Sequence, residues 1–327
     1  MEPLKVYACY NMNEKLRLDS SSGAVFSALA EYVLSCKGIV YGVAMSEDCY
    51  RAEFIGVTDK QRLVKLRGSK YLQAKLGDTY RQVEQNLSAG KLVLFTGTGC
   101  QINGLKLFLR KDYENLICVD VICHGVPSPA LWKKYVLYQE ELYGGKLKSI
   151  NFRCKDESWI DSGMKETFVN ESTQSTETVV TLKKDDSYMR MFLRNHCLRP
   201  SCYNCVSKEI KLSDISIADF WGIDGIIPEM NDGKGTSLVL IRTEKGSEFF
   251  EHISSELQIK EVTYADGIKG NSAEYKSCVR SNMRDHFFID MNHMSYAELA
   301  KKYGAPKKMP LLLKLKRKII FKIKSIM

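Results

Sequence analysis

The chain has 327 residues, of which 44% are hydrophobic and 27% are charged. This composition is typical of a globular protein and excludes a disordered or collagen-like chain. The net charge of +9 suggests an acidic partner, but residues 301–327 carry ten Lys and Arg and no Asp or Glu. The remaining 300 residues have 38 basic and 39 acidic side chains, so they give no support for nucleic-acid binding.

Alternating and helical patterns of apolar residues predict a mixture of strands and helices in the first 90 residues. The expected strands are 4–10, 39–45 and 51–57. The expected helices are 24–36, with Ser22 as its N-cap, and 70–87.

The next part of the chain alternates regularly between short buried strands and helices. Strands are expected at 92–96 and 116–122, followed by helices that end at about 109 and 143. This order indicates an α/β fold with a parallel or mixed sheet flanked by helices. Further strands are expected within 147–183 and at 213–220 and 236–243, and further helices at 186–195 and 246–256. Beyond 265 the periodicity is weak.

The eleven cysteines are the strongest chemical signal. The first residues lack the apolar stretch of a secretory signal, so we expect a reducing cytoplasm, where disulfides are rare. The spacing Cys197-x4-Cys202-x2-Cys205 suits an iron–sulfur cluster or a structural zinc site. A fourth ligand must come from elsewhere. Cys123 is the first choice because it ends an expected buried strand, and Cys100 is the second.

Three segments have the composition of phosphate-binding loops. Ser20–Gly23, Arg67–Tyr71 and Gly97–Gly99 each precede an expected helix. Backbone N–H groups at a helix N-terminus bind anions. An ordinary helix cap or a tight turn would have the same composition.

Together, the motifs resemble the beta subunit of coenzyme F420-reducing hydrogenase and the related formate dehydrogenase beta subunits. The similar segments occur in one order over about residues 4–260: Ser20–Gly23, Gly68–Gln73, Gly97–Gln101, Val119–Ser128, His196–Cys205, Ser213–Ile215, Ala218–Gly222 and Lys234–Ser237. The cysteine loop and the Cys-His-Gly-Val-Pro-Ser segment are the specific ones.

The resemblance implies an iron–sulfur flavoprotein oxidoreductase. Such a protein passes electrons between a 4Fe-4S cluster, FAD and a hydride acceptor or donor, for which coenzyme F420 or another hydride carrier is a candidate. The resemblance assigns Cys197, Cys202 and Cys205 to the cluster, and Cys123 is added by its position. His124 would donate to the flavin or substrate. The implied flavin contacts are Ser21, Ser22, Gly23, Ser69, Lys70, Tyr71, Gln73, Gly97, Thr98 and Gln101.

The chain departs from the family pattern in three places. Many relatives begin with a ferredoxin-like segment that carries two Cys-x2-Cys-x2-Cys runs, and this chain has no such run. We therefore expect a separate electron-donor protein, such as a ferredoxin. The family often has Pro at the position of Gly99 and Gly at the position of Ala24.

The resemblance also divides the chain into three parts. These are 1–88, the flavin-binding part of the core; 89–265, the part with the cysteine loop; and 266–327, an extension. The alternative function is a non-redox protein, stabilised by zinc or using the fold only as a scaffold, in a glycan or cell-envelope pathway.

The C-terminal residues 307–327 form a separate signal. From 311 onward they predict a basic amphipathic helix. Such a helix suits an anionic membrane surface, which would place a cytoplasmic protein peripherally at the inner face of the membrane. A helix docked on the rest of the protein, with its lysines in solvent, is the alternative.

Overall fold

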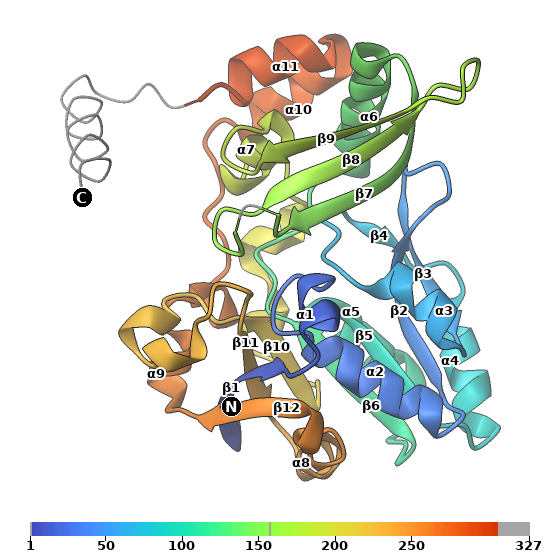
Figure 1. Cartoon of the computed structure of the whole chain (residues 1–327), viewed down its shortest axis with the longest axis vertical. Helices are drawn as coiled ribbons and strands as arrows, with labels where there is room; N and C mark the ends of the chain where they lie inside the picture. The colour runs from blue at the N-terminus through green and yellow to red at the C-terminus, as the bar shows by residue number, and fades with distance from the viewer. Residues whose placement is uncertain (1, 157, 307–327) are drawn as a thin grey trace.

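The computed structural model describes residues 2–156 and 158–306, which form two lobes (Figure 1). The larger lobe, here called the sheet lobe, contains a nine-stranded sheet. The smaller one, the upper lobe, contains a three-stranded sheet and a group of helices. The basic helix expected within 307–327 lies outside the described residues.

The sheet of the sheet lobe has the strand order β12-β1-β11-β10-β6-β5-β2-β3-β4. In that order, the strands are Leu257–Glu261, Lys5–Asn11, Ser237–Ile241, Ile215–Asp219, Leu116–Val121, Val93–Thr98, Ile39–Met45, Ala52–Val57 and Ala74–Lys75. β2, β5, β6 and β10 run parallel, while β1, β3, β11 and β12 join antiparallel. The expected mixed α/β sheet is confirmed.

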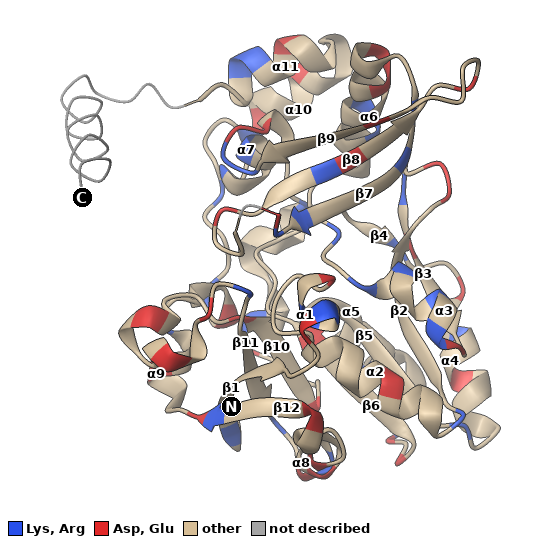
Figure 2. Cartoon of the chain, viewed as in Figure 1, with Lys and Arg blue, Asp and Glu red and all other residues tan. Residues whose placement is uncertain are grey.

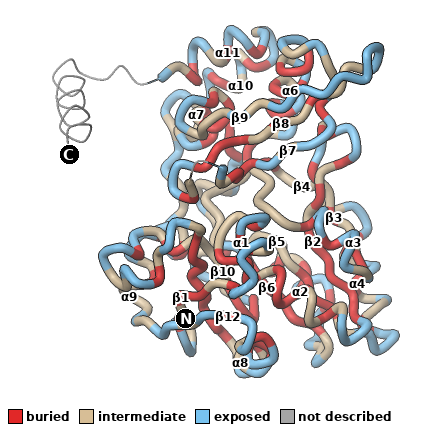
Figure 3. The backbone as a smooth tube through the Cα atoms, viewed as in Figure 1, coloured by how far each residue is buried: buried red, intermediate tan, exposed pale blue. Residues whose placement is uncertain are grey.

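Helices cover both faces of this sheet. The helices concerned are α2 (Val25–Ser35), α4 (Thr79–Ser88), α5 (Gly99–Leu109) and α8 (Glu244–Glu251). α2 and α8 pack on one face and α4 and α5 on the other. β5 shows why: Leu94 belongs to the first of these cores and Phe95 to the second, because successive side chains of a strand point to opposite faces. Central strands such as β6 and β11 are accordingly buried almost throughout, whereas the edge strand β12 is mostly exposed (Figure 3).

The upper lobe has its own hydrophobic core. Its strands are β7 (Lys146–Cys154), β8 (Gly163–Val169) and β9 (Thr176–Leu182). Its helices are α6 (Pro129–Tyr143), α7 (Ser187–Leu193), α10 (Arg284–His293) and α11 (Tyr296–Tyr303). Trp132, Tyr188 and Phe287 are fully buried in this core.

Short elements complete the described structure. The remaining α-helices are α1 (Glu14–Leu18), α3 (Lys60–Leu63) and α9 (Tyr264–Ile268). The 3-10 helices are Val64–Leu66, Pro200–Asn204, Val206–Lys208, Ile223–Gly225, Pro228–Met230, Ser254–Glu256 and Ser272–Glu274. No helix among the described residues is long and apolar enough to cross a bilayer.

Two local predictions were wrong. The helix expected over 70–87 begins only at Thr79, after Gly77 in a left-handed conformation (φ 57°). Ser22 is not the N-cap of α2: that position is Ala24, at φ 65°. The Ser22 hydroxyl instead donates a hydrogen bond to the Thr236 carbonyl at 3.0 Å. In both places tertiary contacts override the local pattern.

Candidate functional site

A pocket of about 650 Å³ lies where the parallel strands end and the upper lobe begins. Register pairs β5 with β6 up to Thr98 and Val121, and β6 with β10 up to Ile217. The carboxyl ends of these strands therefore meet at one edge, the usual ligand-binding position in an open α/β sheet. The volume of the pocket lies within the range of small-molecule sites.

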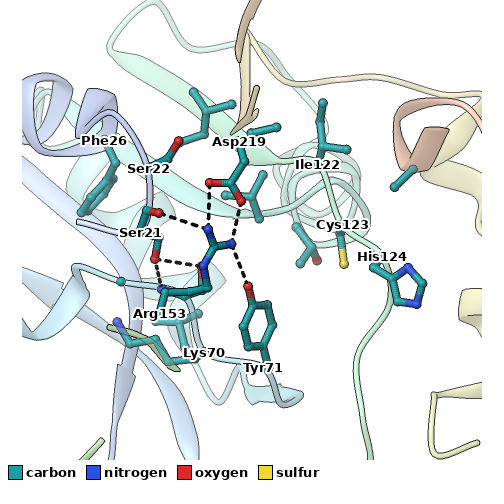
Figure 4. Close-up of a pocket in the computed structure, with 18 of the residues that line it drawn as sticks. Ser21, Ser22, Phe26, Lys70, Tyr71, Ile122, Cys123, His124, Arg153 and Asp219 are labelled. Carbon is teal, nitrogen blue, oxygen red and sulfur yellow. Dashed lines mark hydrogen bonds and ion pairs between the residues drawn. The ribbon is translucent and has the colours of Figure 1, made fainter. Parts of the chain in front are cut away.

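One end of the pocket is rich in hydroxyl groups (Figure 4). The Ser21 hydroxyl accepts hydrogen bonds from the Ser69 backbone N–H at 2.8 Å and from the Ser69 hydroxyl at 3.1 Å. Lys70 donates to the Arg67 carbonyl at 2.7 Å, and burial lowers its pKa to about 7. Two segments 48 residues apart in sequence are thus joined into one wall of the pocket.

Arg153, at the end of β7, reaches from the upper lobe into the middle of this pocket (Figure 4). Its guanidinium forms an ion pair with Asp219 at 2.7 Å and also donates to the Tyr71 hydroxyl at 3.3 Å and the Ser21 carbonyl at 3.4 Å. Burial alone would lower the pKa of Arg153, but Tyr71 and Asp219 raise it overall. Its Nε is buried and has no hydrogen-bond partner among the described residues.

A second cation lines the same pocket. Lys183, just after β9, lies 5.8 Å from the centre of the Trp221 ring, which stacks on Trp159. Burial, with a contribution from Arg153, lowers the pKa of Lys183 to about 8. Because Arg153 and Asp219 neutralise each other, the upper-lobe side of the pocket keeps the positive charge of Lys183.

The N-terminus of α5 forms the floor beneath the pocket. The Gln101 side chain accepts hydrogen bonds from the Thr98 backbone N–H at 2.9 Å and the Thr98 hydroxyl at 3.0 Å. Gln101 therefore acts as a cap of α5, in addition to its place in the lining of the pocket.

The structure brings most of the sequence-predicted flavin contacts together. Those that line the pocket are Ser21, Ser22, Ser69, Lys70, Tyr71, Gly97, Thr98 and Gln101. Gln73 and Gly23 do not line it. Gln73 donates its backbone N–H to the Pro127 carbonyl. Gly23 is a point of close packing, because a Cβ there would lie 2.5 Å from the Cys9 carbonyl oxygen.

Cys123 and His124 lie at the other end of the pocket, after β6 (Figure 4). His124 Nε2 lies 2.6 Å from the Asn195 Oδ1 atom, and burial lowers the pKa of the His124 imidazole. Gly125 follows at φ 152°, and a Cβ there would lie 2.9 Å from the Leu198 side chain. This motif therefore needs glycine for both its conformation and its close approach to the cysteine loop.

Four cysteine thiols lie around Cys202. Burial raises the pKa of Cys123 to about 12, and the nearby thiols of Cys202 and Cys100 act in the same direction. Burial likewise raises the pKa of Cys202, with contributions from Cys100 and Cys205. Cys278 donates its thiol to the Cys202 carbonyl at 3.4 Å. The described residues contain no group of three His, Cys, Asp or Glu side chains placed to hold a single metal ion.

Cys197, the first cysteine of the predicted loop, has different surroundings. Its side chain is completely buried in the upper-lobe core together with Trp132 and Tyr188. Burial raises the pKa of its thiol, with Arg284 acting in the opposite direction and no other cysteine among the causes. Of the predicted set of Cys123, Cys197, Cys202 and Cys205, only Cys123 lines the pocket, and Cys202 packs against the core that contains Cys197.

Sequence reasoning missed several pocket residues. They are Arg153, Lys183, Asp219, Trp221 and Asn271. Asp219 and Trp221 lie in the Ala-Asp-Phe-Trp-Gly segment quoted for the resemblance, so that motif was a usable signal. Arg153 and Lys183 lie at the ends of strands in the upper lobe, and nothing in their local sequence distinguishes them from the basic residues beside them.

Comparisons with known proteins agree on the family, which is described as coenzyme F420 hydrogenase/dehydrogenase, beta subunit. Residues 6–79 match the N-terminal part of this family and residues 90–266 match its C-terminal part. A chain of the F420-reducing [NiFe] hydrogenase complex from Methanosarcina barkeri has a similar fold, with a TM-score of 0.51 and 17% sequence identity. That match covers 79% of this chain and 82% of the other. No curated protein matches.

Proposed function

The chain belongs to the coenzyme F420 hydrogenase/dehydrogenase beta subunit family, which supports an oxidoreductase-type electron-transfer role. On this basis we propose that it is an iron–sulfur flavoprotein that carries electrons between a 4Fe-4S cluster, FAD and an organic hydride acceptor or donor. Coenzyme F420 or another hydride carrier is the candidate substrate.

We propose Cys100, Cys123, Cys202 and Cys205 as the cluster ligands. Thiolates are the ligands that iron–sulfur clusters use. The four thiols come from the start of α5, the end of β6 and the cysteine loop. Cys100 and Cys202 help to raise the pKa of Cys123, and Cys100 and Cys205 help to raise the pKa of Cys202. Cys197 remains the alternative that the sequence predicted.

The residues of the pocket fit FAD. The hydroxyl groups of Ser21 and Ser69, the N-terminus of α5 and a cation such as Lys70 are suited to phosphates and ribose. Arg153 offers a buried N–H that has no acceptor among the described residues, and a lone pair of the ligand would satisfy it. FAD, when bound, would join the one-electron chemistry of a cluster to hydride transfer.

The protein's own side chains would orient and tune these groups. Lys208 donates to the Cys123 carbonyl at 2.7 Å, and its positive charge lowers the Cys123 pKa, against the larger effect of burial. His124, whose pKa is lowered by burial, would be neutral at physiological pH and able to hold or release a proton at Nδ1 or Nε2. The upper lobe would exclude water from the pocket.

The observation that carries the proposal is the position of Cys123. It lines the pocket and also belongs to the group of thiols around Cys202. One residue therefore lies between the candidate flavin site and the candidate cluster, which is the arrangement that direct electron transfer needs.

Anaerobic purification and cofactor analysis test this function. We expect a brown protein with bound FAD and with iron and acid-labile sulfide in a cluster stoichiometry. A colourless protein without iron or flavin after anaerobic reconstitution would contradict the proposal. Stoichiometric zinc in such a sample would favour the zinc-stabilised, non-redox alternative in a glycan or cell-envelope pathway.

The anionic-membrane partner stays a prediction from the sequence, because residues 307–327 lie outside the described residues. If this segment is an anchor, full-length protein should float with anionic liposomes. Deletion of 307–327 should abolish flotation and leave the cofactor content unchanged. Equal flotation of the two proteins would rule the anchor out.

A further inference from the structure

Two chain segments beyond the pocket meet on the outer side of the thiol group. The Cys205 backbone N–H donates to the Ser277 hydroxyl at 2.9 Å, and Lys208 donates to the Ala273 carbonyl. Lys211 forms an ion pair with Glu274 at 3.1 Å. Segments 199–212 and 273–285 therefore form one continuous surface, although about 60 residues separate them in sequence.

Several apolar side chains of these two segments are exposed. Val206 is 62% exposed, Ile210 49%, Tyr275 47% and Val279 81%. Contacts of both segments with the rest of the molecule hold them in place: Asn103 of α5 donates to the Ile210 carbonyl and Asn195 donates to the Val279 carbonyl, each at 2.9 Å. Clustered exposed apolar side chains mark interaction sites, whereas single ones do not. We call Val206, Ile210, Tyr275 and Val279 the apolar patch.

The apolar patch covers the candidate cluster from outside. Val206 follows the proposed ligand Cys205, and Val279 follows Cys278, whose thiol contacts the Cys202 carbonyl. Cys100 is exposed. It lies near the same surface, since a Cβ on its neighbour Gly99 would lie 3.0 Å from the Ser207 side chain. A protein bound here would approach the thiols without entering the pocket.

The charge around the apolar patch is positive. Segments 199–212 and 273–285 contain six Lys and Arg residues against three Asp and Glu, whereas residues 1–300 as a whole have a net charge of −1. Elsewhere the two signs are interspersed over both lobes (Figure 2). Lys211 and Arg280 form ion pairs with Glu274 and Asp285, and Glu209 is exposed beside the patch. Arg199 and Lys276 are the exposed cations that can steer an acidic partner toward the patch.

We infer that the apolar patch is the docking site of an acidic, ferredoxin-type electron-carrier protein that exchanges electrons with the cluster. The inference rests on the proposed function, because the cluster is what gives an electron carrier a reason to bind here. An apolar centre with a basic rim matches the common pattern of a transient interface, in which apolar contacts supply affinity and rim charges supply rate and orientation.

Calorimetric titration with a small acidic two-cluster ferredoxin, performed anaerobically on the full-length protein, tests this. We expect wild type to bind, and binding to weaken as salt rises. Val279→Glu and Ile210→Glu should each weaken binding about tenfold or more, because they put a buried like charge against an acidic partner. Lys276→Glu should mainly slow association. Leu142→Glu, at an apolar position of α6 that is 57% exposed, is the matched control and should bind as wild type does.

FAD and iron are assayed in the same samples, so the two proposals can fail separately. Wild type without flavin and iron would refute the proposed function. Wild type that holds both but does not bind the ferredoxin, or that binds it only as tightly as Val279→Glu and Ile210→Glu do, would overturn the docking site. A wild-type dimer in sedimentation that Val279→Glu dissociates would assign the apolar patch to a second copy of the chain and would also overturn it.

Discussion

In the sheet lobe the site residues follow the ends of parallel strands, whereas in the upper lobe they come from strand ends and loops around a separate core. Thr98, Cys123 and Asp219 follow or end β5, β6 and β10, and the strand register alone brings them to one edge. Arg153 and Lys183 reach the pocket from the three-stranded sheet above it. The sheet lobe thus supplies the positions, and the upper lobe supplies cations and cover.

The two lobes also differ in the polar groups that they bury. The upper-lobe core contains Glu166 and Asp186 close together, bridged by the Tyr135 hydroxyl, which lies 2.9 Å from the first carboxylate and 3.2 Å from the second. The sheet lobe also buries charged groups, but they have close partners: Arg242 forms an ion pair with Glu274 at 2.6 Å, and the Ser213 hydroxyl donates to Asp120 at 2.6 Å. The upper lobe is distinguished by two buried carboxyl groups that lie close together without a cation of the described residues between them.

The largest expected effect on stability is that of the contact between the lobes. Arg153→Leu would leave the Asp219 carboxylate without its cation and should lower the free energy of unfolding by about 3–5 kcal/mol. Chemical denaturation followed by circular dichroism measures this.

The matched control is the double variant Arg153→Leu/Asp219→Asn. Because it leaves no unpaired buried charge, it should recover a large part of the loss. A double variant as unstable as Arg153→Leu would mean that the ion pair does not join the lobes in this way.

The next effect concerns pH. Burial raises the pKa of Glu166 from 4.5 to about 7, so the folded state favours the protonated acid. The stability that it contributes is complete below pH 4.5 and is lost as the pH rises to 7. Relative to Glu166→Gln, which cannot ionise, wild type should lose up to about 3 kcal/mol over that range. Parallel pH dependences of unfolding in the two proteins would contradict the buried acid.

The smallest effect concerns the sheet lobe and the start of α2. Ala24 has φ 65°, a conformation that costs a residue with a Cβ roughly 1 kcal/mol more than glycine. Ala24→Gly should therefore raise stability by up to about 1 kcal/mol and increase the melting temperature. Ala30→Gly, within the same helix, is the control and should lower stability by a similar amount. Destabilisation by both variants would show that no strain is stored at Ala24.

The sequence predicted most strands and helices of the sheet lobe well, because their apolar patterns are regular, but it did not predict the edge strands β4 and β12. The segments at 39–45 and 116–122 became β2 and β6 almost unchanged, and the strand ends carried Thr98 and Cys123 to one place. Local sequence propensity gave a wrong helix start where tertiary contacts determine the backbone conformation. Lys70 was expected to begin a helix, but its ammonium caps backbone carbonyls of the preceding turn.

The upper-lobe part of the site was not predictable from the sequence. Arg153 joins Ser21 and Asp219 over distances of 132 and 66 residues in the chain, and no local pattern indicates such a contact. Spacing grouped Cys197 with Cys202 and Cys205. The structure places the Cys197 side chain in the core because Leu198 and its neighbours fold toward Trp132 and Phe192.

We propose that the cluster is held at the junction of the two lobes by Cys100 and not by Cys197. Iron and acid-labile sulfide in Cys100→Ser and Cys197→Ser, purified and reconstituted anaerobically side by side, test it most directly. The account predicts that Cys100→Ser loses the cluster or keeps an incomplete one, whereas Cys197→Ser keeps the wild-type amount. A full cluster in Cys100→Ser and none in folded Cys197→Ser would contradict it.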